Sequence, residues 1–260
     1  MINYILEKVN HDCLDLQNVL DFACDHDFLD VVTLLFEKTD HKKLDVKKAM
    51  NILCDKWDYY NSENKHESMI KHILEKVNHD FLDLQNVLDH ACLFELVDVV
   101  TLLLEKTDHK KLDVKKAMNI LCDKWDYYND EENKHERIIK HILEKVNHDF
   151  LDLQNVLDHA CLFELVDVVT LLLEKTDHKK LDVKKAMNIL CDEWDYYNDE
   201  ENKHERIIKH ILEKVNHDCL DLQNVLDHAC LFEFVDVVTL LLKKQTIKKL
   251  DVKKSNEHTI

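Results

Sequence analysis

The chain has 260 residues, with 35 Lys plus Arg against 53 Asp plus Glu, which gives a formal net charge of −18. It contains 0 Gly and 0 Pro, whereas average usage is roughly 7% and 5%. P-loops, Rossmann fingerprints and kinase loops need Gly because their backbone must approach a phosphate closely. The composition therefore excludes these nucleotide-binding motifs, and the acidic balance argues against nucleic acids and anionic membranes as partners.

Internal repetition accounts for nearly the whole sequence. The text of residues 82–150 returns almost letter for letter at 151–219, and a slightly shorter copy occupies 14–81. Residues 1–13 hold a partial repeat with only its second helix, and 220–260 hold half a repeat followed by a divergent tail. Tandem arrays of this kind grow by stacking units. We therefore expect these five segments to form one continuous solenoid domain.

Each unit of about 69 residues divides into two related halves. Residues 99–106, VVTLLLEK, align with residues 138–145, IIKHILEK, and the second half carries a nine-residue insertion before this helix. Apolar residues recur at helical spacing in both halves. The sequence thus predicts an all-α fold, a helix-turn-helix repeat solenoid with seven full helix pairs.

Helix boundaries are marked by polar residues. Asp83 is the expected N-cap of the first helix of its half, with Leu82 and Val87 as a hydrophobic staple. Asn133 and Glu136 are spaced as a capping box for the second helix of the long half. The helix that ends near Val146 is followed by Asn147, which we expect to adopt a left-handed cap conformation in place of Gly.

The chain has nine cysteines, an odd number. A position that is repeated in every half inside an apolar stripe indicates a small buried side chain. We expect reduced thiols and hence an intracellular, cytoplasmic protein. Seven cysteines share this position: Cys24, Cys54, Cys92, Cys122, Cys161, Cys191 and Cys230.

Residues 23–38, ACDHDFLDVVTLLFEK, resemble the second half of an ankyrin repeat. The small pair Ala23-Cys24, the turn followed by 28–32 and the paired leucines Leu34-Leu35 carry the likeness, which extends over essentially the whole chain. The near-identical copies also resemble arrays of giant viruses and some protists, which would place the protein in the host cytoplasm if it is viral. The resemblance implies a curved ankyrin-like solenoid that binds another protein on its concave face.

The turn glycine of that family is replaced throughout the array. Because Glu is poor at a left-handed position, we expect this turn to be remodelled or helical, and we do not expect the family's β-hairpins. The replacing residues are Asp27, Glu95, Glu164 and Glu233. A tetratricopeptide-like stack is disfavoured because its signature is absent.

The insertion begins with a Trp-Asp-Tyr-Tyr motif at Trp125 and Trp194, with a variant at Trp57. One interpretation is a row of projecting acidic, aromatic loops that grip a partner; the other, which we favour, is that the Trp continues the buried stripe. Either way, the acidic tips are expected to be exposed and are candidate partner-binding residues: Asp130, Glu131, Glu132, Asp199, Glu200 and Glu201.

Lysines gather at the junction between the two halves of each unit. They oppose the dipole of the helix that follows, so stabilising that helix does not account for them. They form either a basic ridge for an acidic partner or, in the interpretation we favour, a solvated face with counter-charges nearby. The candidate residues are Lys42, Lys43, Lys47, Lys48, Lys110, Lys111, Lys115, Lys116, Lys179, Lys180, Lys184 and Lys185.

Catalysis and metal binding are not expected. His135 and His141 are six residues apart, whereas two zinc ligands on one helix face need a spacing of four. Active sites are singular, but here every Cys and His cluster is repeated. We therefore expect a non-catalytic scaffold for a protein partner, with no catalytic residue, cofactor, metal or small-molecule substrate. A passive spacer or a nucleic-acid binder using the lysines are the alternatives, and end-to-end self-association is a further expectation.

Overall fold

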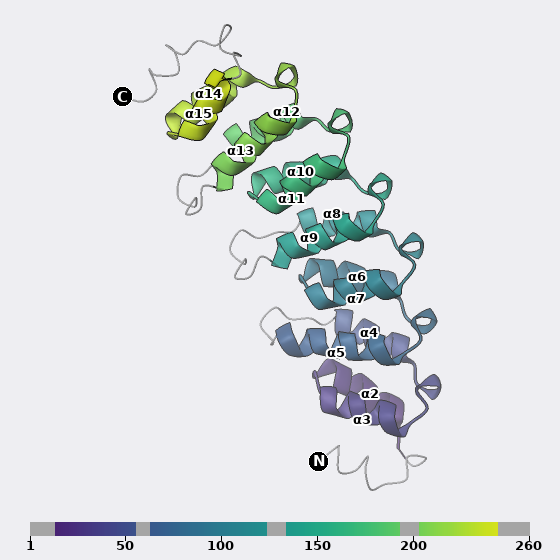
Figure 1. Cartoon of the computed structure of the whole chain (residues 1–260). Coiled ribbons are helices and arrows are strands. Elements are labelled where there is room, and N and C mark those ends of the chain that lie inside the picture. Colours follow the sequence, from purple (N-terminus) through teal and green to yellow (C-terminus); the bar gives the residue numbers. More distant parts are fainter. Residues whose placement is uncertain (1–13, 56–62, 124–133, 193–202, 244–260) are drawn as a thin grey trace. The chain divides into compact units, whose positions relative to one another are not determined.

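The structure is a computed structural model that describes residues 14–55, 63–123, 134–192 and 203–243 (Figure 1). Throughout these ranges the chain forms α-helices and short 3-10 turns, with no strand. The 14 α-helices fall into seven consecutive pairs, as the sequence predicts.

Each pair consists of a first helix and a second helix. The first helices are α2 (Leu16–Asp25), α4 (Val46–Asp55), α6 (Leu84–Leu93), α8 (Val114–Asp123), α10 (Leu153–Leu162), α12 (Val183–Asp192) and α14 (Leu222–Leu231). The second helices are α3 (Leu29–Lys38), α5 (Glu63–Lys76), α7 (Val97–Lys106), α9 (Lys134–Lys145), α11 (Val166–Lys175), α13 (Lys203–Lys214) and α15 (Val235–Lys243). The 3-10 turns between pairs are η2 (His41–Lys43), η3 (His79–Phe81), η4 (His109–Lys111), η5 (His148–Phe150), η6 (His178–Lys180) and η7 (His217–Cys219).

The chain divides into two compact units, residues 1–121 and 122–260. In the first unit α2, α4 and α6 pack side by side in one layer, and α3, α5 and α7 form the second layer. In the second unit one layer is formed by α10, α12 and α14 and the other by α9, α11, α13 and α15. Each unit is thus a two-layer stack of helix pairs; a single continuous solenoid domain stays a prediction.

The first helices begin at the predicted aspartates. The side chain of Asp83 accepts a hydrogen bond from the backbone N–H of Asn86 at 3.3 Å, and Asp152 does the same in the next copy. Such a cap satisfies a backbone donor that the helix leaves free, and its loss typically costs about 1 kcal/mol. The N-cap prediction is confirmed.

The turn between the two helices of a pair does not follow the expectation. Glu95, Glu164 and Glu233 have φ of 54°, 55° and 59° and therefore lie in the left-handed region. The backbone N–H of Leu96 bonds the carbonyl oxygen of Ala91 at 2.9 Å, which closes α6 with a Schellman motif. Leu96 is buried, and its burial outweighs the poor preference of Glu for this conformation. The remodelled or helical turn was a wrong prediction.

The left-handed cap at Asn147 was also a wrong prediction. Asn147 has φ −64° and ψ 125°, which is extended backbone, and its side chain accepts a hydrogen bond from the N–H of Asp149 at 3.1 Å. His148 Nε2 instead bonds the carbonyl oxygen of Leu143 at 2.8 Å and so caps the end of α9. The Asn side chain is used to form the 3-10 turn that follows the helix.

The repeated cysteine position belongs to the core between the layers. All cysteines in the described ranges are free thiols, and burial raises the pKa of Cys54, Cys122 and Cys191 to about 12. Cys191 and Cys230 are half-buried, and Cys219 is exposed. The prediction of buried thiols is confirmed for Cys24, Cys54, Cys92, Cys122 and Cys161.

Candidate interaction surface

The 3-10 turns line up along one edge of each unit (Figure 1). We call the row in each unit its tip edge; the tip edge comprises η2, η3 and η4 in the first unit and η5, η6 and η7 in the second. The tips alternate in chemistry, because η2, η4 and η6 end in two lysines whereas η3 and η5 end in Asp-Phe and η7 in Asp-Cys.

Local hydrogen bonds explain why the tip side chains point outward. Asp108 accepts the backbone N–H of Lys110 on its side chain at 3.1 Å and that of Lys111 on its carbonyl at 2.9 Å. Asn78 does the same for Asp80 and Phe81 in η3. The turn is therefore held by a residue at its base, and the tip side chains are left to the solvent.

The predicted lysine cluster separates into three sets. The lysines in the first turn of α4, α8 and α12 pair with aspartates on the preceding first helix: Lys48 Nζ lies 2.5 Å from Asp21 Oδ2, and Lys185 Nζ lies 2.5 Å from Asp158 Oδ2. Lys116 pairs with Asp89 in the same way. The hydrogen bond to the aspartate raises the pKa of each of these lysines. This set has intramolecular counter-charges, as the favoured interpretation expects.

The second set is the neighbouring lysines of the same helices. Lys47 Nζ lies 3.6 Å from Asp83 Oδ2 on the next repeat, and Lys115 and Lys184 are exposed. The third set is the tip lysines, all of which are exposed: Lys42, Lys43, Lys110, Lys111, Lys179 and Lys180. Lys180 Nζ lies 3.9 Å from Asp149 Oδ1, and the two side chains are 69% and 75% exposed, so water screens this pair strongly.

Two exposed aromatic rings of the tip edge were missed at the sequence level. Phe81 and Phe150 are 57% and 59% exposed. Their register could have been found by aligning the halves, since NHDF at 78–81 stands where DHKK stands at 108–111. Phe81 therefore corresponds to the exposed Lys111.

The insertions lie outside the described residues. This applies to their tryptophans and to the predicted acidic residues Asp130, Glu131, Glu132, Asp199, Glu200 and Glu201.

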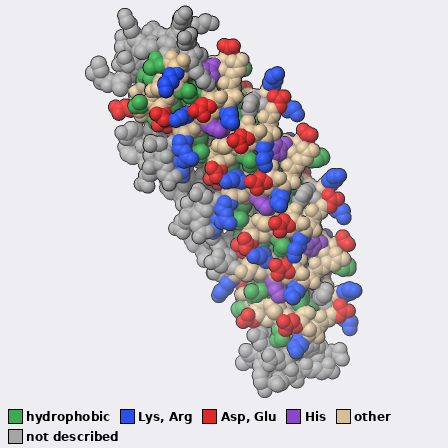
Figure 2. Space-filling view, viewed as in Figure 1, with side chains coloured by type: hydrophobic (Ala, Val, Ile, Leu, Met, Phe, Trp, Pro, Cys, Tyr) green, Lys and Arg blue, Asp and Glu red, His purple; other side chains and the backbone are tan. Residues whose placement is uncertain are grey.

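Opposite charges are intermixed over the visible face (Figure 2). Lys71 Nζ lies 2.6 Å from Asp98 Oδ2, and Lys140 and Lys209 make the equivalent pairs with Asp167 and Asp236. These pairs join successive second helices. Away from the tip edge, these pairs thus join opposite charges on neighbouring repeats.

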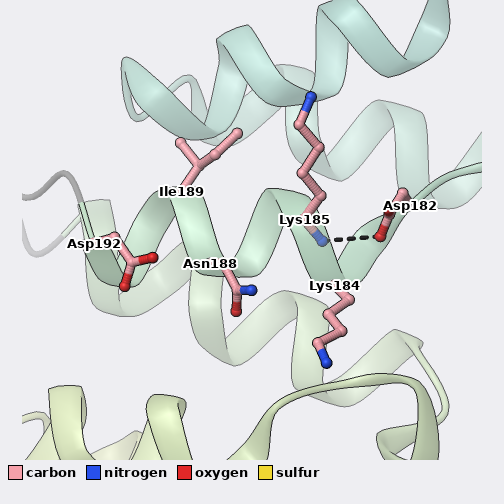
Figure 3. A pocket seen from close by; sticks show the side chains of 6 residues that line it. All are labelled: Asp182, Lys184, Lys185, Asn188, Ile189 and Asp192. Atoms are coloured by element: carbon pink, nitrogen blue, oxygen red, sulfur yellow. Dashed lines mark hydrogen bonds between the residues drawn. The ribbon is translucent and has the colours of Figure 1, made fainter.

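A hollow of about 310 Å³ lies along α12 in the second unit (Figure 3). Its lining comes from this helix and its cap, and includes Asp182, Lys184 and Asp192. Asn188 also lines it, and within the described ranges its buried Oδ1 has no hydrogen-bond partner. Lys185 donates its backbone N–H to Asp182 and its ammonium to Asp158. The hollow therefore lies along a single helix, and two of the charged residues that line it, Asp182 and Lys185, are already engaged in helix capping and inter-repeat pairing.

The histidine pair of the insertion half does not converge on one point. His135 is buried and contacts His159 Nε2 at 2.8 Å, whereas the Nε2 of His141 is buried without a hydrogen-bond partner among the described residues. Over these same ranges no group of three or more His, Cys, Asp or Glu side chains is placed to hold a metal ion.

Comparison with known proteins adds no relative, because no family model, no curated protein and no solved structure matches the chain. In the part of the chain that the structure describes, no helix is both long and apolar enough to cross a membrane. The candidate surface therefore stands on its own geometry.

Proposed function

We propose that this protein is a non-catalytic, ankyrin-like scaffold that binds another protein through its tip edge. The observation that carries the proposal is the alternation of exposed rings and exposed lysine pairs along that edge. Phe81 lies between the lysine tips of η2 and η4 in the chain, and Phe150 precedes the lysine tip of η6. Aromatic residues are enriched in the energetic centres of protein interfaces, and exposed charges steer association.

The chemistry of the tips indicates the kind of partner. A ring that is more than half exposed on a short turn gains from burial in an apolar pocket. The lysine pairs on either side favour carboxylates around that pocket. We therefore infer a partner whose surface has acidic residues around small apolar pockets, spaced to match alternate turns. The first-turn lysines, such as Lys116, contribute less because their charge is already paired with an aspartate.

The test is capture from cytosol by the full chain after crosslinking, at low and high salt. In one variant all six tip lysines are changed to Glu: Lys42, Lys43, Lys110, Lys111, Lys179 and Lys180. In a second variant the two rings are changed, Phe81→Ser and Phe150→Ser. The control carries the same change of charge at six exposed lysines near the ends of second helices: Lys38, Lys76, Lys106, Lys145, Lys175 and Lys214.

The proposal expects one protein to be captured by the wild type and the control and lost from both tip variants. Equal capture by all four chains would contradict binding through the tip edge. Capture that depends on RNA or DNA would favour the nucleic-acid alternative, since lysines and rings also bind single strands, although the net charge of −18 opposes it. Capture of no specific protein would favour the spacer.

A further inference from the structure

Three junctions between successive helix pairs bury two histidine rings in contact. The Nε2 atoms lie 3.2 Å apart in His66 and His90, 2.8 Å apart in His135 and His159, and 3.1 Å apart in His204 and His228. All six side chains are at most 6% exposed. Buried titratable groups in contact are uncommon, and here the arrangement recurs in every double unit.

The repeat itself builds these contacts, which we call the histidine pairs. One ring comes from the first turns of the second helix that follows the insertion, in α5, α9 or α13. The other comes from the last turn of the next first helix, in α6, α10 or α14. The two rings are 24 residues apart in each case. Each histidine pair therefore links one helix pair to the next.

The outer nitrogens of the first junction are also engaged. His66 Nδ1 lies 3.3 Å from a carboxylate oxygen of Asp27, in the turn before α3, and Lys65 lies close enough to act on that carboxylate. His90 hydrogen-bonds the backbone of Cys54, and Asp55 at the end of α4 favours its protonated form.

The later junctions repeat this environment. In the third junction Glu164 lies 3.1 Å from His204 Nδ1, while the backbone of Cys191 and the carboxylate of Asp192 face His228. In the middle junction the backbone of Cys122 faces His159. The rings are thus held from both sides by neighbouring repeats.

Proton counting decides what such a contact can tolerate. Two imidazole nitrogens about 3 Å apart form one N–H···N hydrogen bond when a single proton lies between them. If both rings are cationic, each Nε2 carries a hydrogen, so two N–H groups and two positive charges face each other. Burial away from water makes this repulsion strong. A doubly protonated pair therefore does not fit the observed contact.

We propose that the histidine pairs are acid-sensitive joints: on acidification the second proton forces the two rings apart and loosens the junction between helix pairs. The carboxylates of Asp27 and Glu164 balance the first proton of their pairs but not the second. The array then opens at specific places, which are the junctions after each long half.

The pKa values agree in direction with this joint. Burial lowers the pKa of His66, His90 and His228 to about 4 and that of His159 to about 3, and the partner ring is a second cause for His90, His159 and His228. A histidine whose folded pKa is lowered binds its proton mainly after unfolding, for which the ordinary value is about 6.5. Its contribution to stability is therefore complete above pH 6.5 and is lost as the pH falls from 6.5 toward 4. Burial raises the pKa of Asp27. Protonation of this carboxylate therefore favours the folded state as the pH falls, which is the opposite of the effect of the histidines, but it does so in the lower pH range where carboxyl groups titrate.

The experiment measures the urea midpoint of the full chain by circular dichroism between pH 7.5 and pH 5.0. The test variant is His90→Gln with His159→Gln and His228→Gln, because an amide still hydrogen-bonds the remaining ring but does not titrate. The matched control changes three histidines of the 3-10 turns to Gln: His79, His148 and His217, whose Nε2 atoms bond carbonyl oxygens.

For each ring with a strongly lowered pKa, we expect the unfolding equilibrium to rise about tenfold by pH 5.5 relative to neutral pH. The wild type and the control should lose stability steeply, whereas the test variant should lose most of this dependence. The same pH slope in the test variant and the wild type would overturn the proposal.

A second measurement keeps the test decisive if the variant does not fold. The backbones of Cys54, Cys122 and Cys191 hydrogen-bond the second ring of the three histidine pairs, so these cysteines lie at the junctions. The exposed Cys219 serves as an internal reference. Labelling the wild type with 4,4′-dithiodipyridine, which reacts in acid, should show these three thiols becoming reactive relative to Cys219 between pH 7 and pH 5. If the labelling of these three thiols relative to Cys219 stays the same over this pH range, the proposal of an acid-sensitive joint is overturned.

Discussion

Glu136 Oε1 of α9 accepts a hydrogen bond from the backbone N–H of Asp167 in α11, at 3.0 Å. Asp167 lies in the first turn of α11, and the N-cap residue of that helix, Leu165, makes no side-chain cap. Glu67 and Glu205 make the same bond to Asp98 and Asp236. A glutamate on one second helix therefore caps the next, which ties the start of each helix to its neighbour.

Replacing Glu136 by Ala should lower the free energy of unfolding by about 1 kcal/mol, because a backbone donor at a helix start loses its acceptor. Burial raises the pKa of Glu136, so the contribution of this side chain to stability falls as the pH rises and the carboxyl group ionises. Glu136→Gln keeps an oxygen acceptor without the charge and should cost less than Ala. Urea unfolding of both variants at pH 7 measures the difference, and an equal loss would contradict the capping role.

The exposed Glu144, in the last turn of the same helix, provides the matched control. Glu144→Ala removes the same side chain from a site where a carboxylate opposes the helix dipole. It should leave the midpoint unchanged or raise it slightly. A decrease equal to that of Glu136→Ala would show that the effect does not arise from the cap.

Replacing Glu233 by Gly should stabilise the protein by about 0.5–1 kcal/mol. Glu233 has φ 59°, and the strain of a side chain in the left-handed region outweighs the entropy that Gly loses on folding. Glu233→Val should instead destabilise by about 1 kcal/mol, since β-branched residues tolerate this region poorly. Thermal melting of both variants gives opposite signs if the turn is left-handed, and a loss in both would argue against it.

The features that could be predicted from the sequence are the local and periodic ones. The helix pairs follow from apolar spacing, and Asp83 acts within three residues of its own position. The burial of Cys92 follows from its place in the apolar stripe. In each case the determining partners lie within one or two helical turns.

The features that could not be predicted depend on a neighbouring repeat. Glu136 fits a capping box with Asn133 in sequence, yet its described partner is 31 residues away. His66 and His90 are 24 residues apart, and no local pattern brings them together. The stacking register sets all of these contacts.

Replacing Cys161 by Leu should destabilise the protein by about 1–3 kcal/mol, because a larger side chain overpacks a filled core. Cys161 is 2% exposed and lies in the stripe of α10. Cys219→Leu is the control, since this thiol is exposed on η7 and should tolerate the change. Urea midpoints of the two variants test the assignment, and equal stability would place Cys161 outside the packed layer.

The side-chain amide of Gln85 hydrogen-bonds the start of α8 through both its oxygen and its nitrogen. Its Oε1 accepts the backbone N–H of Asp113 at 2.7 Å, and its Nε2 donates to the carbonyl oxygen of Asp113 at 3.4 Å and to Asp89 at 2.7 Å. Gln85→Ala removes these bonds and should cost about 1 kcal/mol. Gln85→Glu should cost more, because a carboxylate cannot donate to the carbonyl and repels Asp89.

The equivalent residue Gln154 makes the same bonds to Asp182 and Asp158, so the two positions can be compared in separate units. We expect the same order, wild type above Ala above Glu, at both positions in urea unfolding at pH 7. At pH 4 the Glu variants should approach the Ala variants, since protonation removes the repulsion and restores a donor. A Glu variant that matches the wild type at pH 7 would show that the Nε2 donor of the glutamine contributes nothing to stability.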